Sequence, residues 1–406
     1  MLGHKRANLA LTALAVSTFS FVTTEILPVG LLTLMADDLQ RSRSAVGLLM
    51  TGYAVVVMVL SLPLARLTQR VPRRLLLSGT LGVFAAANLV TALAPGYGVL
   101  LGARLVVGAT QALFWSIVAS TATTLFPPQR RGRTVARLSV GAALGPVLGV
   151  PLGTWLGQQA GWRAAFLAMA AVGAVTCAAL VALLPAHERG TEAVVVRGSA
   201  PDARRFAILV VAVAICVTGA LTLQTYVTPF LLDVSGFAPD ALGPLLLAAG
   251  LAGLAGTVAV GRFLDRYAYL ALVVPLVLLC AGLLAMYWLG GLGPAAVAAL
   301  ALCNLSYGAM AAAVQNRVLM VAPGSADVAS AGTSSAFNVG IAAGSLVGGM
   351  IIDGPGVRST ALVGGALTLL AVVLVLAEPV LAGRISIVES RENDSITGNT
   401  SPIRRT

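Results

Sequence analysis

One acidic side chain of this sequence lies deep inside an apolar segment. Glu25 sits roughly two-thirds of the way along the first apolar run, whereas the other fourteen of the fifteen Asp and Glu residues lie in polar segments, in tails or near the ends of apolar runs. An ionised carboxylate at such a depth costs about 2.5–3.5 kcal/mol, and a low dielectric favours its neutral form. Glu25 is therefore a candidate for binding and releasing a proton. The alternative is a purely structural carboxylate, held by nearby hydroxyls or by Arg104.

Arg104 is the only basic residue in the middle of an apolar run. It is followed at spacings of four, three and four residues by Gly108, Gln111 and Trp115, which places all four on one face of a helix. That face is typical of a cavity lining. The cation of Arg104 is followed by the space left at Gly108, and then come the Gln111 amide and the aromatic ring of Trp115. An arginine that packs helices together by bonding backbone carbonyls is equally compatible with Arg104 taken alone.

A dense glycine and proline pattern marks the fifth apolar run. Glycines four residues apart form a flat groove for close helix contact, and prolines remove backbone donors and kink a helix. The pattern predicts a kinked, tightly packed helix that suits a gate or a seal, although simple close packing would give the same glycines. Its members are Gly141, Gly145, Pro146, Gly149, Pro151 and Gly153. Gly340, Gly344 and Gly348 repeat the groove without proline in the eleventh run.

The composition indicates the elements that must position these residues. Of 406 residues, 58% are hydrophobic and only 10% are charged, against about 25% charged in a soluble protein. We expect an all-α membrane protein with twelve transmembrane helices in two pseudo-symmetric six-helix bundles. The predicted spans are 8–35, 45–66, 75–94, 99–125, 138–159, 164–184, 206–232, 241–263, 269–290, 294–320, 330–352 and 359–382.

Basic residues are distributed unevenly between the two ends of these spans. Twenty-one of the 26 Lys and Arg residues fall on the side of the two termini, which predicts that both termini are cytoplasmic. The net charge of +11 does not indicate nucleic-acid binding, because the bases come in short bursts between apolar runs and not as one exposed stripe. The four cysteines lie in apolar runs without metal-ligand or disulfide spacing, so we expect no metal and no cofactor other than the proton.

The two halves of the chain are related. Arg104-x3-Gly108 and Asn304-x3-Gly308 lie 200 positions apart, and Thr24-Glu25-x2-Pro28 has a counterpart beginning at Thr225. Parallel repeats of this kind place a substrate site near the midplane between the halves. The expected organisation is an N-terminal bundle at 1–184, a cytoplasmic linker at 185–205, a C-terminal bundle at 206–383 and a flexible cytoplasmic tail at 384–406.

These motifs resemble those of the major facilitator superfamily, in particular its drug:proton antiporters and, within them, the bacterial sugar efflux transporters that export arabinose and thiogalactosides. The similar blocks are 23–32 (TTEILPVGLL), 112–120 (ALFWSIVAS), 149–166 (GVPLGTWLGQQAGWRAAF), 225–230 (TYVTPF) and 336–349 (AFNVGIAAGSLVGG). The resemblance implies that Glu25 couples transport to protons. It also implies cavity positions for Phe114, Trp115, Ser116, Tyr226, Gln315 and Asn338. Together with Thr24, Arg104 and Gln111, these residues form the expected substrate site.

One motif of the superfamily departs from its pattern. In the loop after the second span, Ala65 and Gln69 stand where the superfamily has Gly and Asp, and only Arg70 and the following arginine pair persist. A cytoplasmic latch formed by Arg70, Asp265 and Arg266 is therefore expected to depend on the C-terminal pair. A solvated turn is the alternative for that pair.

The expected function is proton-coupled export of sugars or sugar-like molecules by alternating access, from a monomer in the bacterial inner membrane. An exporter of chloramphenicol or other hydrophobic drugs, which would confer drug resistance, is the first alternative. A non-transporting membrane sensor is a remote one, because the tail and the linker are too short for a signalling domain. An enzyme is not expected, because the apolar runs contain no histidine and no nucleophile paired with a base.

Overall fold

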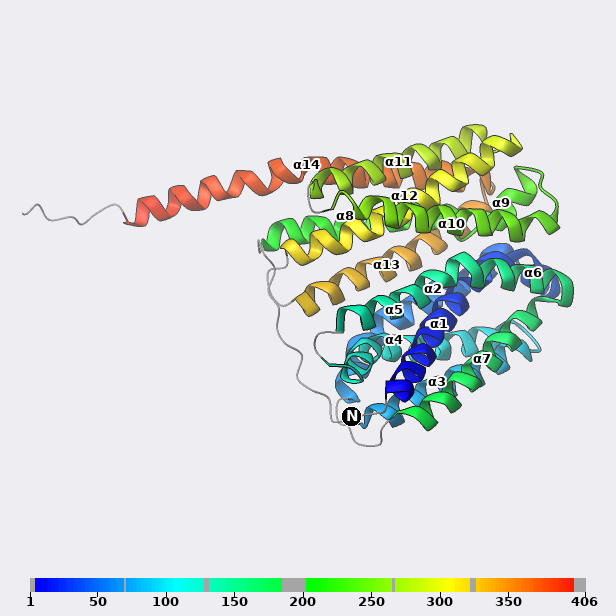
Figure 1. Cartoon of the computed structure of the whole chain (residues 1–406). Coiled ribbons are helices and arrows are strands. Elements are labelled where there is room, and N and C mark those ends of the chain that lie inside the picture. The colour runs from blue at the N-terminus through cyan, green and yellow to red at the C-terminus, as the bar shows by residue number, and fades with distance from the viewer. Residues whose placement is uncertain are drawn as a thin grey trace, which may run out of the picture.

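The computed structural model describes residues 4–68, 71–127, 131–184, 202–264, 267–321 and 326–397. Within these ranges the regular structure is helical throughout, and twelve helices are long and apolar enough to cross a membrane. Figure 1 shows two stacked bundles, one running from blue to green and the other from green to red. This confirms the all-helical class and the twelve spans expected from the sequence.

The N-terminal bundle holds the first six spans, the fifth of which is divided into three pieces. Helix α5 (Arg131–Leu144) leads into a π-helical turn, η2 (Gly145–Gly149), and then into α6 (Val150–Ala160). The other spans are α1 (His4–Asp38), α2 (Arg43–Leu67), α3 (Arg73–Ala92), α4 (Tyr97–Thr124) and α7 (Trp162–Leu183).

The C-terminal bundle begins with a broken span. Helix α8 (Ala203–Gln224) ends shortly before α9 (Val227–Asp233). The next span enters through a short 3₁₀ helix, η3 (Pro239–Ala241). The remaining helices are α10 (Leu242–Gly261), α11 (Ala268–Leu289), α12 (Gly293–Val321), α13 (Ala326–Ile352) and α14 (Arg358–Thr397).

Helix α14 differs from the expectation at its end. It continues to Thr397 and projects beyond the bundle (Figure 1), although a flexible tail was expected from residue 384. Neither Gly nor Pro occurs between Gly383 and Gly398, so no residue in this stretch interrupts a helix that has already begun.

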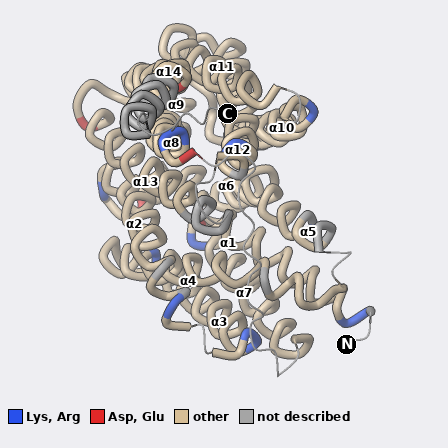
Figure 2. Tube along the Cα trace, turned by 90° about the vertical axis from the view of Figure 1, so that its left-hand side faces the viewer, with Lys and Arg blue, Asp and Glu red and all other residues tan. Residues whose placement is uncertain are grey.

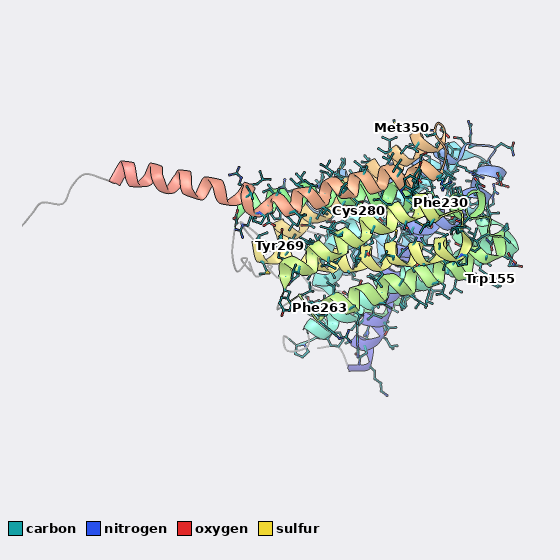
Figure 3. The ribbon with its side chains drawn as sticks, turned by 90° about the horizontal axis from the view of Figure 1, so that it is seen from above. Trp155, Phe230, Phe263, Tyr269, Cys280 and Met350 are labelled. Carbon is teal, nitrogen blue, oxygen red and sulfur yellow. The ribbon has the colours of Figure 1, made fainter. Side chains whose placement is uncertain are left out.

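The helix ends define two sides of the molecule. We call the side where α7 ends and α8 begins the linker side, and the side of the turn between α1 and α2 the distal side. Figure 3 shows Phe263 and Tyr269 toward the linker side and Trp155, Phe230 and Met350 toward the distal side. Basic residues mark the linker-side helix ends, seen from that side in Figure 2; among them are Lys5, Arg66, Arg73, Arg204 and Arg262.

The predicted glycine grooves receive pseudo-equivalent helices. In the fifth span, a Cβ at Gly145 would lie 2.7 Å from Val22 Cγ1 of α1. In the eleventh, a Cβ at Gly344 would lie 2.6 Å from the Thr218 carbonyl of α8. Each bundle is thus closed by a glycine-lined helix that packs on the first helix of that bundle, as membrane helices do when small residues allow it.

A π turn interrupts the α-helix of the fifth span at the predicted glycines and prolines. Val150 N–H bonds the Gly145 carbonyl five residues back, and Pro146 and Pro151 lack the donors that a regular helix would need. The turn also faces the other bundle, because the Pro146 carbonyl would lie 2.7 Å from a Cβ at Gly250 of α10. The break is therefore placed where the two bundles meet.

Gly141→Ala tests the first groove. The new methyl group would collide with the Ala15 carbonyl of α1, which is backbone and cannot turn away, so we expect a loss of about 1–3 kcal/mol by overpacking. The matched control is Gly79→Ala in α3, where a Cβ meets nothing within 4 Å. Thermal unfolding in detergent should show a lower Tm for Gly141→Ala alone. Equal melting of the two variants would contradict the close packing.

Candidate functional site

The core of the site is a bond between an arginine and a proline-kinked helix. Pro28 lies inside α1 and has no N–H, so the Thr24 carbonyl, four residues earlier, loses its helical partner. Arg104 Nη1 of α4 donates to that carbonyl at 2.6 Å, and its Nη2 donates to the Glu25 carbonyl at 3.1 Å. Arg104 is 0% exposed. Of the alternatives that the sequence left open, this geometry matches the arginine that bonds backbone carbonyls.

Gly108 explains how α2 reaches this arginine. A Cβ at Gly108 would lie 3.1 Å from the Tyr53 carbonyl, so the glycine lets α2 and α4 approach closely. The guanidinium carbon of Arg104 then lies 4.6 Å from the centre of the Tyr53 ring. A cation over an aromatic face is attracted by the ring quadrupole, which helps to hold a charge that would otherwise be costly in the membrane.

Glu25 ends a directed chain of hydrogen bonds. Tyr53 Oη donates to Gln111 Oε1 at 2.6 Å, and Gln111 Nε2 donates to Glu25 Oε2 at 2.8 Å. Both bonds point their hydrogens toward the carboxylate, which is the arrangement that stabilises an ionised acid. The Glu25 carboxylate is thus held by Gln111, while Arg104 bonds the main chain of α1. The Val29 carbonyl, one turn beyond Glu25 in α1, accepts a hydrogen bond from Thr228 of the other bundle, so the acid is near the boundary between the bundles.

Of the three predicted ligand residues in the next turn of α4, two are exposed and one is buried. Trp115 is 41% exposed and Ser116 is also exposed. Phe114 is fully buried, stacked on Phe21 with ring centres 4.4 Å apart. Trp115 and Ser116 are therefore accessible, whereas Phe114 lies in the core of the N-terminal bundle. Thr24 is buried as well, and its hydroxyl has no hydrogen-bond partner within the described part of the chain.

Tyr226 lies where the bundles touch on the distal side. It is fully buried, and its hydroxyl donates to the Ser345 carbonyl at 2.9 Å. Its ring fills a notch between the bundles, because Cβ atoms placed at Gly47 of α2 and Gly348 of α13 would overlap it. The structure places this predicted ligand residue in a closed interface and away from an open cavity.

Several polar contacts join the bundles at the same end. Arg43 pairs with Asp233, Ser44 with Asp353, and the Thr228 hydroxyl donates to the Val29 carbonyl at 2.5 Å. Both side chains of the Arg43–Asp233 pair are more than one-third exposed. The pair therefore helps to align the two bundles more than it stabilises them. Together these contacts close the distal side.

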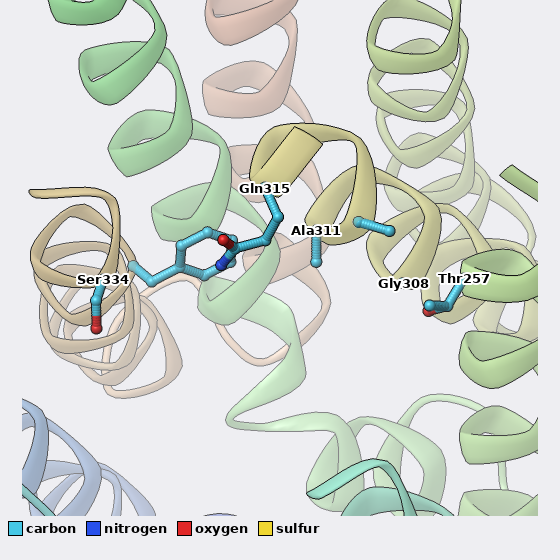
Figure 4. Close-up of a pocket in the computed structure, with 7 residues that line it drawn as sticks. Thr257, Gly308, Ala311, Gln315 and Ser334 are labelled. Atoms are coloured by element: carbon cyan, nitrogen blue, oxygen red, sulfur yellow. The ribbon is translucent and has the colours of Figure 1, made fainter. Parts of the chain in front are cut away.

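The predicted C-terminal ligand residues lie in and beside an open cavity. Gln315 of α12 is exposed and lines a cavity of about 350 Å³ (Figure 4). Asn338 of α13 follows a lining residue, Phe337; its Nδ2 donates to the Ser334 carbonyl at 2.9 Å. The predicted latch residues Arg70, Asp265 and Arg266 lie outside the described residues.

Sequence reasoning missed two elements of the site. Tyr53 belongs to a regular apolar helix face, and its spacing carries no signal, since its importance comes from contacts with α4. Glu378 was taken for an acid near a span end, yet it is only 5% exposed and bonds Arg317 Nη2 at 2.9 Å. A glutamate directly before Pro379 in an apolar run was the available clue.

Comparison with known proteins shows the family of this chain. The model of the Major Facilitator Superfamily matches residues 13–332. A "Probable sugar efflux transporter" of Helicobacter pylori strain G27 is 33% identical over 372 residues, which cover 91% of this chain and 94% of the relative. Its counterpart in strain J99 is 32% identical and covers 88% and 92%.

Solved structures share the fold at lower identity. A bacterial homologue of the human lysosomal transporter Spinster, in an inward-facing and occupied conformation, has a TM-score of 0.71 at 17% identity, with 95% of this chain and 97% of that chain covered. The human organic anion transporter MFSD10 has a TM-score of 0.64 at 16% identity and covers 92% and 100%.

The chain therefore belongs to the Major Facilitator Superfamily. It is a multi-pass membrane transporter of small molecules and not an enzyme, and the relatives above carry the name "Probable sugar efflux transporter".

Arg104→Leu tests the bond to α1. The substitution leaves the buried Thr24 carbonyl without a donor, which costs about 1–3 kcal/mol, so we expect a lower Tm and weakened transport. Arg104→Lys should recover only part of the loss, since a single ammonium has no planar fork. Unfolding curves and uptake by vesicles measure the two effects. A fully stable Arg104→Leu protein would show that the bond is dispensable.

A cysteine pair tests the closed distal side. A Cβ at Gly349 would lie 3.3 Å from Ser44 Cβ, close to the separation of about 3.5–4.5 Å in disulfides. The double variant Ser44→Cys with Gly349→Cys should cross-link under mild oxidation and lose transport, and a reductant should restore it. Each single variant is the control. Transport that continues in fully cross-linked protein would mean that the two helices need not separate.

Proposed function

We propose that this protein exports neutral sugars or sugar-like molecules in exchange for protons, from the cytoplasmic membrane of a bacterium. The observation that carries the proposal is the Glu25 carboxyl, an acid inside α1 that is held by Gln111 and lies one turn from the contact between Val29 and Thr228 of the other bundle. The names of the relatives support the substrate class. The excess of basic residues on the linker side supports a cytoplasmic location for that side.

The cycle that we propose alternates access to Glu25. With the distal side closed, substrate enters from the linker side and Glu25 is ionised, its charge stabilised by the N–H of Gln111. Opening of the distal side releases substrate and admits a proton to the carboxylate. The neutral acid no longer carries a charge through the membrane interior, so the return step avoids the cost of moving an ion across it.

The energetics are adequate for one proton per cycle. A membrane potential of about 100 mV supplies ~2.3 kcal/mol per charge. At ~1.4 kcal/mol per factor of ten, this corresponds to a substrate gradient of roughly fiftyfold. Export against a concentration gradient therefore needs no second energy source in this proposal.

The interface with α9 gives the opening step a physical basis. Helix α9 is a separate seven-residue helix, and it carries both Thr228, which bonds α1, and Asp233, which pairs with Arg43 of α2. Loss of these contacts would free the distal end of the seventh span from the N-terminal bundle. The proposal assigns α1, α2 and α9 to the distal gate.

Glu25→Gln is the decisive variant. It preserves the size of the side chain and removes the titrating group, so we expect sugar binding to persist and sugar-driven proton movement to fall at least tenfold. The matched control is Asp37→Asn, an exposed acid on the same helix, which should behave like the wild type. Proteoliposomes with an internal pH dye measure both. Proton movement retained in Glu25→Gln would remove Glu25 from the mechanism, and a signal with chloramphenicol alone would reassign the substrate to drugs.

A further inference from the structure

Two arginines of the N-terminal bundle meet at the linker-side end of α7. Arg6, near the start of α1, donates through Nη2 to the Ala182 carbonyl at 2.6 Å. Arg74, near the start of α3, donates through Nη2 to the Val181 carbonyl at 2.5 Å. The two carbonyls belong to consecutive residues in the last turn of α7, where carbonyls have no partner within the helix. The two guanidinium groups are therefore brought together at one helix end.

The charge of the two arginines exceeds what this helix end can balance. The C-terminus of a helix carries the equivalent of roughly −0.5 elementary charge, whereas the two guanidinium groups carry two full positive charges. Lys5 and Arg73 are their neighbours in the chain, and Lys5 is exposed. Figure 2 shows blue segments at this end of the bundle, near α3 and near the N-terminus. The helix dipole thus explains one capping cation but leaves the site strongly positive.

The described part of the N-terminal bundle offers no acid at this end. The acidic residues in its described ranges are Glu25, which is held inside the bundle by Gln111, and Asp37 and Asp38 at the distal end of α1. Asp37 lies roughly 45 Å from Arg6 along α1, at 1.5 Å per residue, which is several Debye lengths at physiological ionic strength. Within the described ranges, the two arginines therefore have no counter-charge.

An exposed apolar surface lies directly beside the two arginines. Leu75 follows Arg74 in α3 and is 64% exposed, and Val181, whose carbonyl Arg74 binds, is 44% exposed. Val175, between one and two turns nearer to the membrane centre in α7, is 68% exposed. Such side chains on the outside of a membrane span contact acyl chains. Cations at the helix ends above an apolar surface match the two parts of a phospholipid, its headgroup and its acyl chains.

We infer that Arg6 and Arg74 bind the phosphate of an anionic phospholipid in the leaflet on the linker side, with an acyl chain lying along Leu75 and Val181. Each guanidinium uses Nη2 for a carbonyl of α7 and keeps further N–H groups, whose planar fork suits phosphate oxygens. A zwitterionic lipid brings a cation of its own and relieves the excess charge less well. The bound phosphate joins the ends of α1, α3 and α7 where the chain leaves the bundle for the linker. The inference is independent of sugar export.

Lipid-dependent unfolding of the full chain in detergent tests this site. Phosphatidylglycerol should raise the Tm of wild type more than phosphatidylcholine does, because a ligand that binds the folded state stabilises it. In the double variant Arg6→Gln with Arg74→Gln, the affinity for phosphatidylglycerol should fall at least tenfold, a change of ~1.4 kcal/mol. Arg262→Gln removes an exposed arginine on the same side of the other bundle and should behave like the wild type. Each variant is compared with itself without added lipid, so the lost bonds to α7 do not enter the comparison.

A headgroup without acyl chains separates a lipid site from a site for soluble phosphate compounds. Glycerophosphoglycerol carries the phosphodiester of phosphatidylglycerol, and it should bind wild type at least tenfold more weakly than the lipid does. Leu75→Ser should weaken binding of the lipid and leave binding of the soluble headgroup unchanged. Native mass spectrometry counts the bound lipid in each variant.

Three results would overturn the inference. The first is an equal response of the wild type to phosphatidylglycerol and phosphatidylcholine. The second is wild-type affinity for phosphatidylglycerol in the folded double variant, and the third is binding of glycerophosphoglycerol as tight as that of the lipid. None of these measurements depends on transport, so the proposed export function would stand in each case.

Discussion

The structure depends on how each bundle treats the carbonyl that a proline leaves without a partner. In α1, Pro28 frees the Thr24 carbonyl, and Arg104 binds it, so the helix runs unbroken from His4 to Asp38. In the lipid interior an unsatisfied backbone group costs several kcal/mol. The two hydrogen bonds from the buried guanidinium to carbonyls therefore offset the cost of removing its charge from water. The same bond fixes the turn that bears Glu25. The position of Glu25 therefore depends on the hydrogen bond from Arg104 that replaces the one lost at Pro28.

The C-terminal bundle solves the equivalent problem differently. Pro229 lies in the motif equivalent to that of Pro28, but Asn304 stands in the place of Arg104 and bonds its own helix through the Leu300 carbonyl. The seventh span is divided into α8 and α9 at Thr225 and Tyr226. The first span, which has the arginine, is one continuous helix, and the seventh span, which lacks it, is two helices. The division lies where the bundles meet.

The parts of this fold that follow from local pattern could be predicted from the sequence. Apolar run length determines the twelve spans, and glycines four residues apart marked the grooves that receive α1 and α8. The sequence could not decide between the two roles of Arg104, because lining a cavity and bonding backbone carbonyls both need an arginine at the same position. Tyr53 could not be found at all, since its ring contacts α4 across sequence separations of more than fifty residues. Tyr226 was correctly placed in a motif, yet the depth of its burial depends on Gly47 in the other bundle.

The two bundles differ in what the polar residue at this equivalent position binds. Arg104 bonds two carbonyls of α1 and so holds the main chain of the turn that carries Glu25. Asn304 makes its hydrogen bonds within the C-terminal bundle, donating to the Leu300 carbonyl and accepting from Gln224 of α8. The division of the seventh span places α9 where Thr228 bonds the Val29 carbonyl of α1, one turn from Glu25. The two repeats thus differ at one equivalent position, where the first has an arginine that binds a freed carbonyl and the second has an asparagine that bonds within its own bundle.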